Sequence, residues 1–266
     1  MDLGLTGKTA LVSAASKGLG LATARELVRE GARVMINSHD PANLETALAS
    51  LREELGAGIP VTAHAADLTD PEAVAGLVAA TAREHGGLDI LVTNNGGPPA
   101  GSLESTDIDA WRAGLELTLM SAVHLVRSAL PHLKTSDAAS VLTITSVSVK
   151  QPVPGLFLSN VIRPAVVGLT KAIAQELGRD HGIRANSILP GWTATERVGY
   201  ILQQRAEAAG TTPDEESQKV AANVPLGRMA EPEEFGRVAA FLASPAASYL
   251  NGAMIQLDGG AYGGLL

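Results

Sequence analysis

Short runs of apolar, β-forming residues alternate along this chain with longer segments of helical periodicity, and this alternation constrains the fold more than any other feature. Two strands joined by a helix lie parallel in one sheet, and the crossover between them is right-handed. Strands are predicted at residues 9–14, 33–38, 61–68, 89–95, 140–146, 184–191 and 253–260. We therefore expect an α/β, doubly wound domain in which helices cover both faces of a seven-stranded parallel sheet.

The helical segments between these strands complete one domain. They are predicted at about residues 19–30, 41–55, 71–85, 107–133, 160–180 and 231–243. A chain of 266 residues is long enough for one large core, so residues 1–266 are expected to form a single domain. The longest stretch without a strand, at about 192–225, contains a Thr-Thr-Pro break and is predicted to be a mobile lid over a substrate.

Charge and composition limit the classes of partner. The net charge of −8 argues against nucleic acid or an anionic membrane as a partner, because both require a basic face. No window reaches about 18 uninterrupted apolar residues, which argues against a membrane span. The chain has no cysteine, which is compatible with a cytoplasmic location, and its histidines lack the spacing of a metal site. A small molecule is the expected ligand, without a metal.

A glycine-rich turn, SAASKGLG at residues 13–20, joins the first predicted strand to the first helix. Glycines allow backbone amides to approach a pyrophosphate, and the helix N-terminus provides a favourable field for anions. The turn therefore indicates a dinucleotide site at the carboxyl edge of the sheet. The alternative is a tight turn with no ligand.

Several further motifs follow in order: AADL at 65–68, NNGG at 94–97, PGWTAT at 190–195, and a long ending from PLGRM to LDGG at 225–260. With the glycine-rich turn they resemble the short-chain dehydrogenase/reductase family over about residues 5–262. The resemblance implies a Rossmann-type domain, a nicotinamide dinucleotide at the carboxyl edge, and a homo-oligomer, either a tetramer or a dimer.

The resemblance also assigns the cofactor contacts. Gly18 and Gly20 match the second and third glycines of the family's loop, while Ala14 replaces the first. A methyl group is tolerated there at negative φ, but it restricts a turn that needs positive φ. The implied cofactor-binding residues are Ser13, Ala14, Ser16, Lys17, Gly18, Leu19, Gly20, Ser38, His39, Asp67, Leu68, Asn94, Asn95, Gly96, Arg163, Pro190, Gly191, Thr193 and Thr195.

The end of the second strand bears on the choice between NADP and NAD. A carboxylate there would accept the ribose 2′-hydroxyl and repel a 2′-phosphate, but the matching residue is Ser38, followed by His39 and facing Lys17. These residues favour NADP. Asp40 lies two places beyond the matched position, so NAD remains possible.

At the catalytic end the chain departs from the family's pattern. The resemblance implies four catalytic positions, and the family's serine is retained as Ser146. Its tyrosine, lysine and asparagine correspond to Ser159, Arg163 and Thr118. An aliphatic hydroxyl is a poor acid or base near neutral pH, and arginine stays protonated, so Arg163 is expected to bind ribose or a substrate anion.

Residues Ser159 and Arg163 are four apart and share a helical face, but Pro164 predicts a kink or a late helix start here. In an alternative interpretation, Ser159 and Asn160 only cap the helix and Arg163 is a surface or interface charge. Tyr200 and Lys150 are further candidates for a proton donor.

Three functions remain open on the sequence. The first is an NAD(P)-dependent oxidoreductase that reduces a carbonyl, such as an oxoacyl group, through Ser146, a water and Arg163. The second is a cofactor-bound isomerase or lyase in which Arg163 holds an anionic substrate. The third is a non-catalytic dinucleotide-binding protein. Fold alone does not decide among them.

Overall fold

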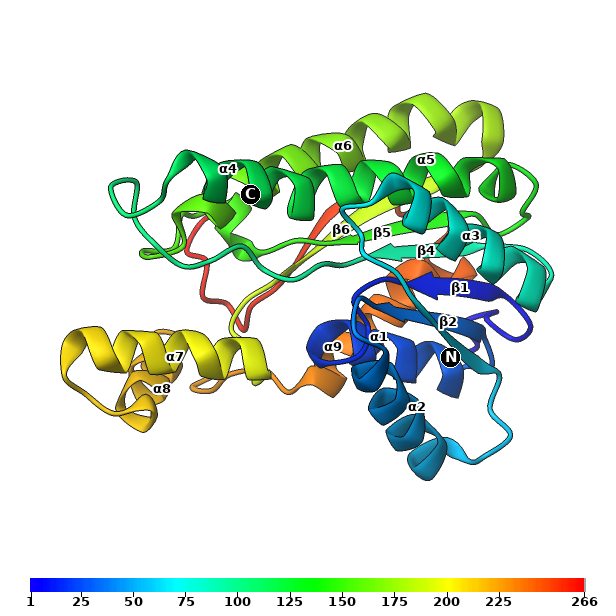
Figure 1. Ribbon diagram of the computed structural model, residues 1–266. Coiled ribbons are helices and arrows are strands. Elements are labelled where there is room, and N and C mark those ends of the chain that lie inside the picture. Colours follow the sequence, from blue (N-terminus) through cyan, green and yellow to red (C-terminus); the bar gives the residue numbers. More distant parts are fainter. Residues whose placement is uncertain (266) are drawn as a thin grey trace.

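Seven parallel strands form one sheet in the computed structural model, which describes residues 1–265 (Figure 1). The strands are β1 (Thr9–Val12), β2 (Arg33–Ser38), β3 (Val61–Ala65), β4 (Ile90–Thr93), β5 (Ser140–Ile144), β6 (Arg184–Pro190) and β7 (Met254–Leu257). Their order, β3-β2-β1-β4-β5-β6-β7, reverses between β1 and β4. This confirms the predicted sheet and opens a crevice at the carboxyl ends of β1 and β4.

Helices cover both faces of the sheet (Figure 1). One face carries α1 (Gly18–Arg29), α2 (Pro41–Leu55) and α9 (Pro232–Ala243), and the other carries α3 (Pro71–His85), α5 (Ser121–Leu133) and α6 (Phe157–His181). Successive residues of β1 point to opposite faces: Ala10 and Val12 belong to one core cluster, and Leu11 belongs to the other. Burial on both sides explains why this strand is a continuous apolar run.

The helix predicted over residues 107–133 is interrupted. It consists of α4 (Ile108–Leu115), one π-helical turn (Glu116–Met120) and α5. A π-helical turn inserts an extra residue and often marks a functional site. It places Thr118 inside the protein, where the side chain is buried.

The late start predicted for α6 is wrong. The helix begins at Phe157 and continues through Pro164 to His181, so Ser159 and Asn160 lie within it and are not caps. Pro164, the eighth residue of the helix, has no N–H to donate to the carbonyl of Asn160. The Asn160 amide side chain instead pairs with the backbone of Val153, accepting from its N at 3.0 Å and donating to its O at 2.9 Å.

Among the described residues 1–265, α6 is also the one helix with the length and apolar composition of a membrane span. The helix packs against β5 and β6 in the body of the domain.

The segment predicted as a lid contains α7 (Glu196–Ala209) and α8 (Pro213–Ala222). These helices project as an arm that follows the carboxyl end of β6 (Figure 1). The break between them is a capping box, in which Thr212 and Glu215 each accept a hydrogen bond from the other's backbone N–H. The mobility of this arm stays a prediction.

Candidate active site

The turn after β1 leads into a helix N-terminus that is open to a ligand. Lys17 is the N-cap of α1, but its side chain makes no capping hydrogen bond, and the first turn holds no acidic residue. A Cβ on Gly20 would lie 2.5 Å from the Ala14 carbonyl oxygen, so the turn closes tightly on the helix. The amides of the first helical turn therefore remain available, and the cradle fits the diphosphate of a dinucleotide.

Ala14 adopts a left-handed conformation with φ of 45°, the one positive φ among the described non-glycine residues. Its N donates to Asn37 Oδ1 at 3.3 Å, and its O accepts from Asn94 Nδ2 at 3.0 Å. These bonds, from β2 and from the loop after β4, hold the strained residue in place. The turn therefore needs the positive φ that the family's glycine would adopt without strain.

At the end of β2, Ser38 and Asp40 make different contacts. Ser38 is buried, and its hydroxyl accepts from the backbone N of Asp40 at 3.2 Å. The Asp40 carboxylate caps α2, accepting from Ala42 N at 2.9 Å and from Asn43 Nδ2 at 2.8 Å. Because its oxygens are engaged in the cap, Asp40 is poorly placed to bind ribose hydroxyls.

Two other predicted cofactor residues organise the loops on this edge. The Ser13 hydroxyl donates to the Asn94 carbonyl at 2.7 Å and joins β1 to the loop after β4. Asp67 accepts from the backbone N and the hydroxyl of Thr69 at 2.9 and 2.8 Å, and these bonds lower the pKa of its carboxyl below the usual value. Asp67 is therefore an anion at neutral pH.

A cavity of about 380 Å³ joins the turn after β1 to the residues after β5 and to α6. The predicted site residues that line it are Ala14, Lys17, Gly18, Leu19, Asn94, Asn95, Gly96, Ser146, Ser159, Arg163, Pro190, Gly191, Thr193 and Thr195. The predicted residues outside its lining are Ser13, Ser16, Gly20, Ser38, His39, Asp67, Leu68 and Thr118. The two ends that the sequence analysis considered separately therefore share one cavity.

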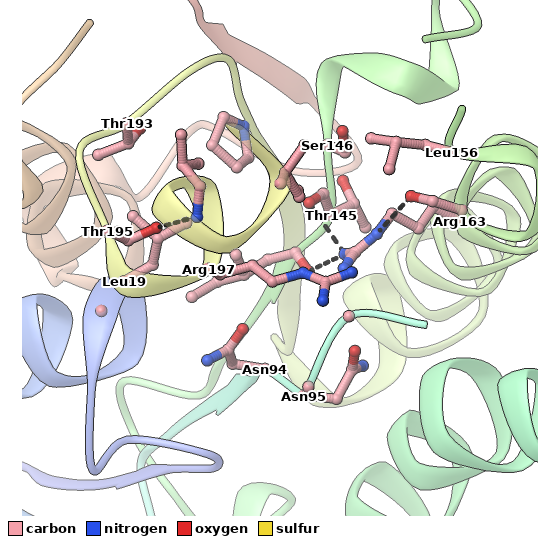
Figure 2. A pocket seen from close by; sticks show the side chains of 18 of the residues that line it. Leu19, Asn94, Asn95, Thr145, Ser146, Leu156, Arg163, Thr193, Thr195 and Arg197 are labelled. Carbon is pink, nitrogen blue, oxygen red and sulfur yellow. Dashed lines mark hydrogen bonds between the residues drawn. The ribbon is translucent and has the colours of Figure 1, made fainter. Parts of the chain in front are cut away.

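Arg163 extends from α6 into this cavity (Figure 2). Its Nε donates to Ser159 Oγ at 3.1 Å, and its Nη1 donates to the carbonyl oxygens of Thr145 at 2.9 Å and Ile144 at 3.3 Å. Burial, with a smaller contribution from the nearby Arg197, lowers the pKa of Arg163 to about 10. The side chain is thus a fixed cation in the site and not a surface charge.

Ser146 lies beside this cation at the end of β5. Its Oγ accepts from the backbone N of Ser148 at 3.0 Å, which leaves its own hydroxyl hydrogen available to a ligand. The hydroxyls of Ser148 and Ser159 approach to 3.5 Å. Ser146 can therefore donate to a substrate oxygen, while Ser159 is engaged with Arg163.

Arg197, in the first turn of α7, is a site residue that the sequence analysis missed. Its guanidinium reaches across the cavity, and Nη2 donates to the Pro98 carbonyl at 2.6 Å (Figure 2). Arg197 lies two residues after the end of the matched PGWTAT motif. This short spacing was the signal that could have identified Arg197 as a site residue, because α7 begins directly after a motif that lines the site.

The other candidate proton donors lie outside the cavity lining. Tyr200 is 53% exposed, and Arg197 stacks over its ring with 5.6 Å between the guanidinium carbon and the ring centroid. Lys150 Nζ lies 5.4 Å from the ring centroid of Tyr262. Neither Tyr200 nor Lys150 lines the cavity that holds Ser146.

Thr118 lies behind the cavity lining, near Asn95. The Asn95 amide Nδ2 donates to the Thr118 carbonyl at 3.3 Å. Asn95 Oδ1 and Thr118 Oγ1 are both buried, and the described part of the chain offers neither atom a hydrogen-bond partner. Unpartnered buried oxygens of this kind are where an ordered water is expected.

The comparisons with known proteins agree over nearly the whole chain. A family model described as enoyl-(acyl carrier protein) reductase matches residues 13–262. D-beta-hydroxybutyrate dehydrogenase from Cupriavidus necator is 32% identical over 96% of this chain and 98% of its own length. This chain belongs to the short-chain dehydrogenase/reductase family.

Solved structures of other family members show the same arrangement. L-sorbose reductase from Gluconobacter frateurii, complexed with NADPH and L-sorbose, has a TM-score of 0.92 at 31% identity and covers all of both chains. A short-chain oxidoreductase from Pseudomonas aeruginosa with an atypical catalytic centre, bound to NADPH, has a TM-score of 0.88 at 30% identity over 97% of this chain and 98% of its own. The short-chain dehydrogenase/reductase fold is thus shown along the whole chain.

Proposed function

We propose that this chain is an NADP-dependent oxidoreductase that reduces the carbonyl group of a small molecule. One observation carries the proposal: the turn after β1, Ser146 and Arg163 line a single cavity. The related structures bound to NADPH and the related dehydrogenases support the redox class. Ser38, the exposed Lys17 and the engaged Asp40 support NADP over NAD.

The residues present fit the dinucleotide and divide its contacts between them. The α1 N-terminus would hold the diphosphate, and Arg163 would face the nicotinamide ribose. When bound, the cofactor supplies a hydride to the carbonyl carbon of the substrate. The chain's own residues act on the carbonyl oxygen, where negative charge develops.

Ser146 donates its hydroxyl hydrogen to that oxygen, and the fixed charge of Arg163 stabilises the developing anion. Ser159 holds Arg163 and is not the proton donor, because an aliphatic hydroxyl cannot be tuned to neutral pH. The proton that ends on the oxygen comes from solvent through a relay water, which Thr118 Oγ1 and Asn95 Oδ1 are free to bind, and a proton from solvent replaces the one that this water gives up.

Titration with NADPH and NADH, followed by fluorescence, tests the cofactor, and oxidation of NADPH across a panel of carbonyl compounds tests the reaction. Arg163→Ala should lower turnover by about 100-fold, in the range measured for removal of one electrostatic donor. Exposed Arg237 on α9 provides the matched control, since Arg237→Ala leaves the cavity intact. Tight NADPH binding without oxidation by any carbonyl would favour a non-redox enzyme or a non-catalytic binder.

We further propose that the protein is a cytoplasmic homo-oligomer. The apolar side chains of Ile108, Leu115 and Val161 are exposed on the neighbouring helices α4 and α6, which supports burial against a second copy. Light scattering on the purified protein measures the assembly directly.

A further inference from the structure

Two arginine side chains meet in the cavity without a carboxylate partner. Arg163 comes from α6 and Arg197 from α7, and Figure 2 shows their guanidinium groups side by side. Among the described residues 1–265, neither guanidinium forms an ion pair. Glu196 also lines the cavity, but its carboxylate pairs with Lys17 at 3.1 Å.

Each guanidinium has N–H donors that find no acceptor among the described residues. Arg163 donates through Nε and Nη1, and the described residues provide no acceptor for its Nη2. Arg197 donates through Nη2 alone, so its Nε and Nη1 are also without an acceptor in this part of the chain. The unused donors belong to two separate elements that meet at one cavity.

This arrangement is unfavourable without a ligand. Burial lowers the pKa of both guanidinium groups, and Arg197 lowers that of Arg163 further by repulsion. Buried charges are normally paired, and an unpaired one costs free energy. A carboxylate supplies two acceptor oxygens and one negative charge, which match the planar fork of a guanidinium.

We propose that Arg163 and Arg197 together bind a carboxylate of the substrate, so that the site takes an oxo acid. This inference rests on the proposed carbonyl reduction and names the class of its substrate. Arg163 Nη1 is bonded to the carbonyl of Thr145, the neighbour of Ser146. This bond places the cation beside Ser146, which fits acids whose carboxylate and carbonyl are close together, namely 2-oxo and 3-oxo acids.

The test measures binding without turnover. Protein saturated with NADP⁺ is titrated calorimetrically with short 2-oxo and 3-oxo acids and with the primary amide of each. No reduction occurs, because the oxidised cofactor has no hydride to give. We expect at least one acid to bind at least about 10-fold more tightly than its amide, because the amide lacks the negative charge that strengthens hydrogen bonds to a guanidinium. Equal affinities for every acid and its amide would overturn the proposal.

Variants assign this preference to the arginine on α7. Arg197→Gln should bring the acid-to-amide ratio near one while leaving the NADP⁺ affinity unchanged, and Arg197→Lys should retain part of the ratio. The matched control Arg237→Gln, on the exposed side of α9, should retain all of it. An undiminished ratio in Arg197→Gln contradicts the proposal. If Arg197→Gln does not fold, two other measurements test the site. Arg197→Lys should retain part of the acid-to-amide ratio, and chloride should compete with the acid for the unsubstituted protein.

The two proposals fail in different ways. If no carbonyl compound oxidises NADPH but acids still bind more tightly than amides, the reductase is wrong and the anion site stands. If amides or neutral ketones are reduced as readily as acids, the reductase stands and the anion site is wrong. If NADP⁺ does not bind, the same titrations on the cofactor-free protein decide the anion site.

Discussion

Arg163 Nε donates to Ser159 Oγ across one turn of α6, at 3.1 Å. The two residues that the sequence analysis matched to the family's tyrosine and lysine positions are therefore bonded to each other. Ser159 fixes the guanidinium, and the carbonyls of Thr145 and Ile144 fix it from the strand side. At these two positions the structure therefore has a positive charge anchored by three hydrogen bonds.

Cofactor choice should respond to Ser38. Ser38→Asp places a carboxylate at the end of β2, where it repels a 2′-phosphate and can accept a ribose hydroxyl. We expect the ratio of NADPH to NADH affinity to fall by at least about 10-fold, or about 1.4 kcal/mol. Fluorescence titration with both nucleotides measures this ratio. An unchanged ratio would show that the 2′-phosphate does not approach Ser38.

Asp40 should affect stability and not cofactor choice. Asp40→Ala removes the cap of α2, so the free energy of unfolding should fall by about 1 kcal/mol. Urea denaturation measures that loss. The ratio of NADPH to NADH affinity should stay constant, because the carboxylate is engaged by the helix. A rise in this ratio would mean that Asp40 does contact the ribose.

Ala14→Gly should stabilise the protein. Glycine adopts a φ of 45° without the left-handed penalty of about 1–2 kcal/mol, although its flexible unfolded state offsets about 0.4–1 kcal/mol of this gain. We expect a net gain of about 1 kcal/mol in urea denaturation, with tighter NADPH binding. The neighbouring buried Ala15 is the control, since Ala15→Gly only removes a packed methyl group and should destabilise.

The affinity of the protein for an anionic substrate should fall at high pH. A cationic group holds its charge below its pKa, and the pKa of Arg163 is lowered to about 10. The affinity of the NADP⁺ complex for a 2-oxo acid should therefore be nearly constant from about pH 6 to about 9 and fall as the pH rises through about 10. Calorimetry over this range measures the change. The affinity of the paired amide, which lacks the charge, should not show this fall.

The layers of the fold follow from the sequence because the signals that fix them are local. Runs such as TALV and SVLTI are buried on both faces, and the helices between them carry ordinary periodicity. The π-helical turn around Thr118 could not be predicted, because ELTLM reads as regular helix and nothing in its pattern marks an inserted residue. The start of α6 differs from the prediction because packing against β5 and β6 outweighs the penalty of Pro164.

The candidate site also has residues that could be predicted from the sequence and residues that could not. The turn after β1 could be predicted because glycine spacing carries a backbone requirement, and Ser146 and Arg163 followed from fixed spacings. The PGWTAT motif places Arg197 near the site, but the direction of its side chain could not be predicted, because it depends on how α7 lies across the cavity from Pro98. The sign of φ at Ala14 likewise depends on bonds from Asn37 and Asn94, which are distant in sequence.

The ion pair between Lys17 and Glu196 connects the nucleotide end to the arm formed by α7 and α8. A 2′-phosphate would compete with Glu196 for the same ammonium group and release the first residue of α7. Arg197 is the next residue along the chain, so nucleotide binding would change the position of a residue in the proposed carboxylate site. Steady-state kinetics should then show a compulsory order, with the dinucleotide entering before the acid.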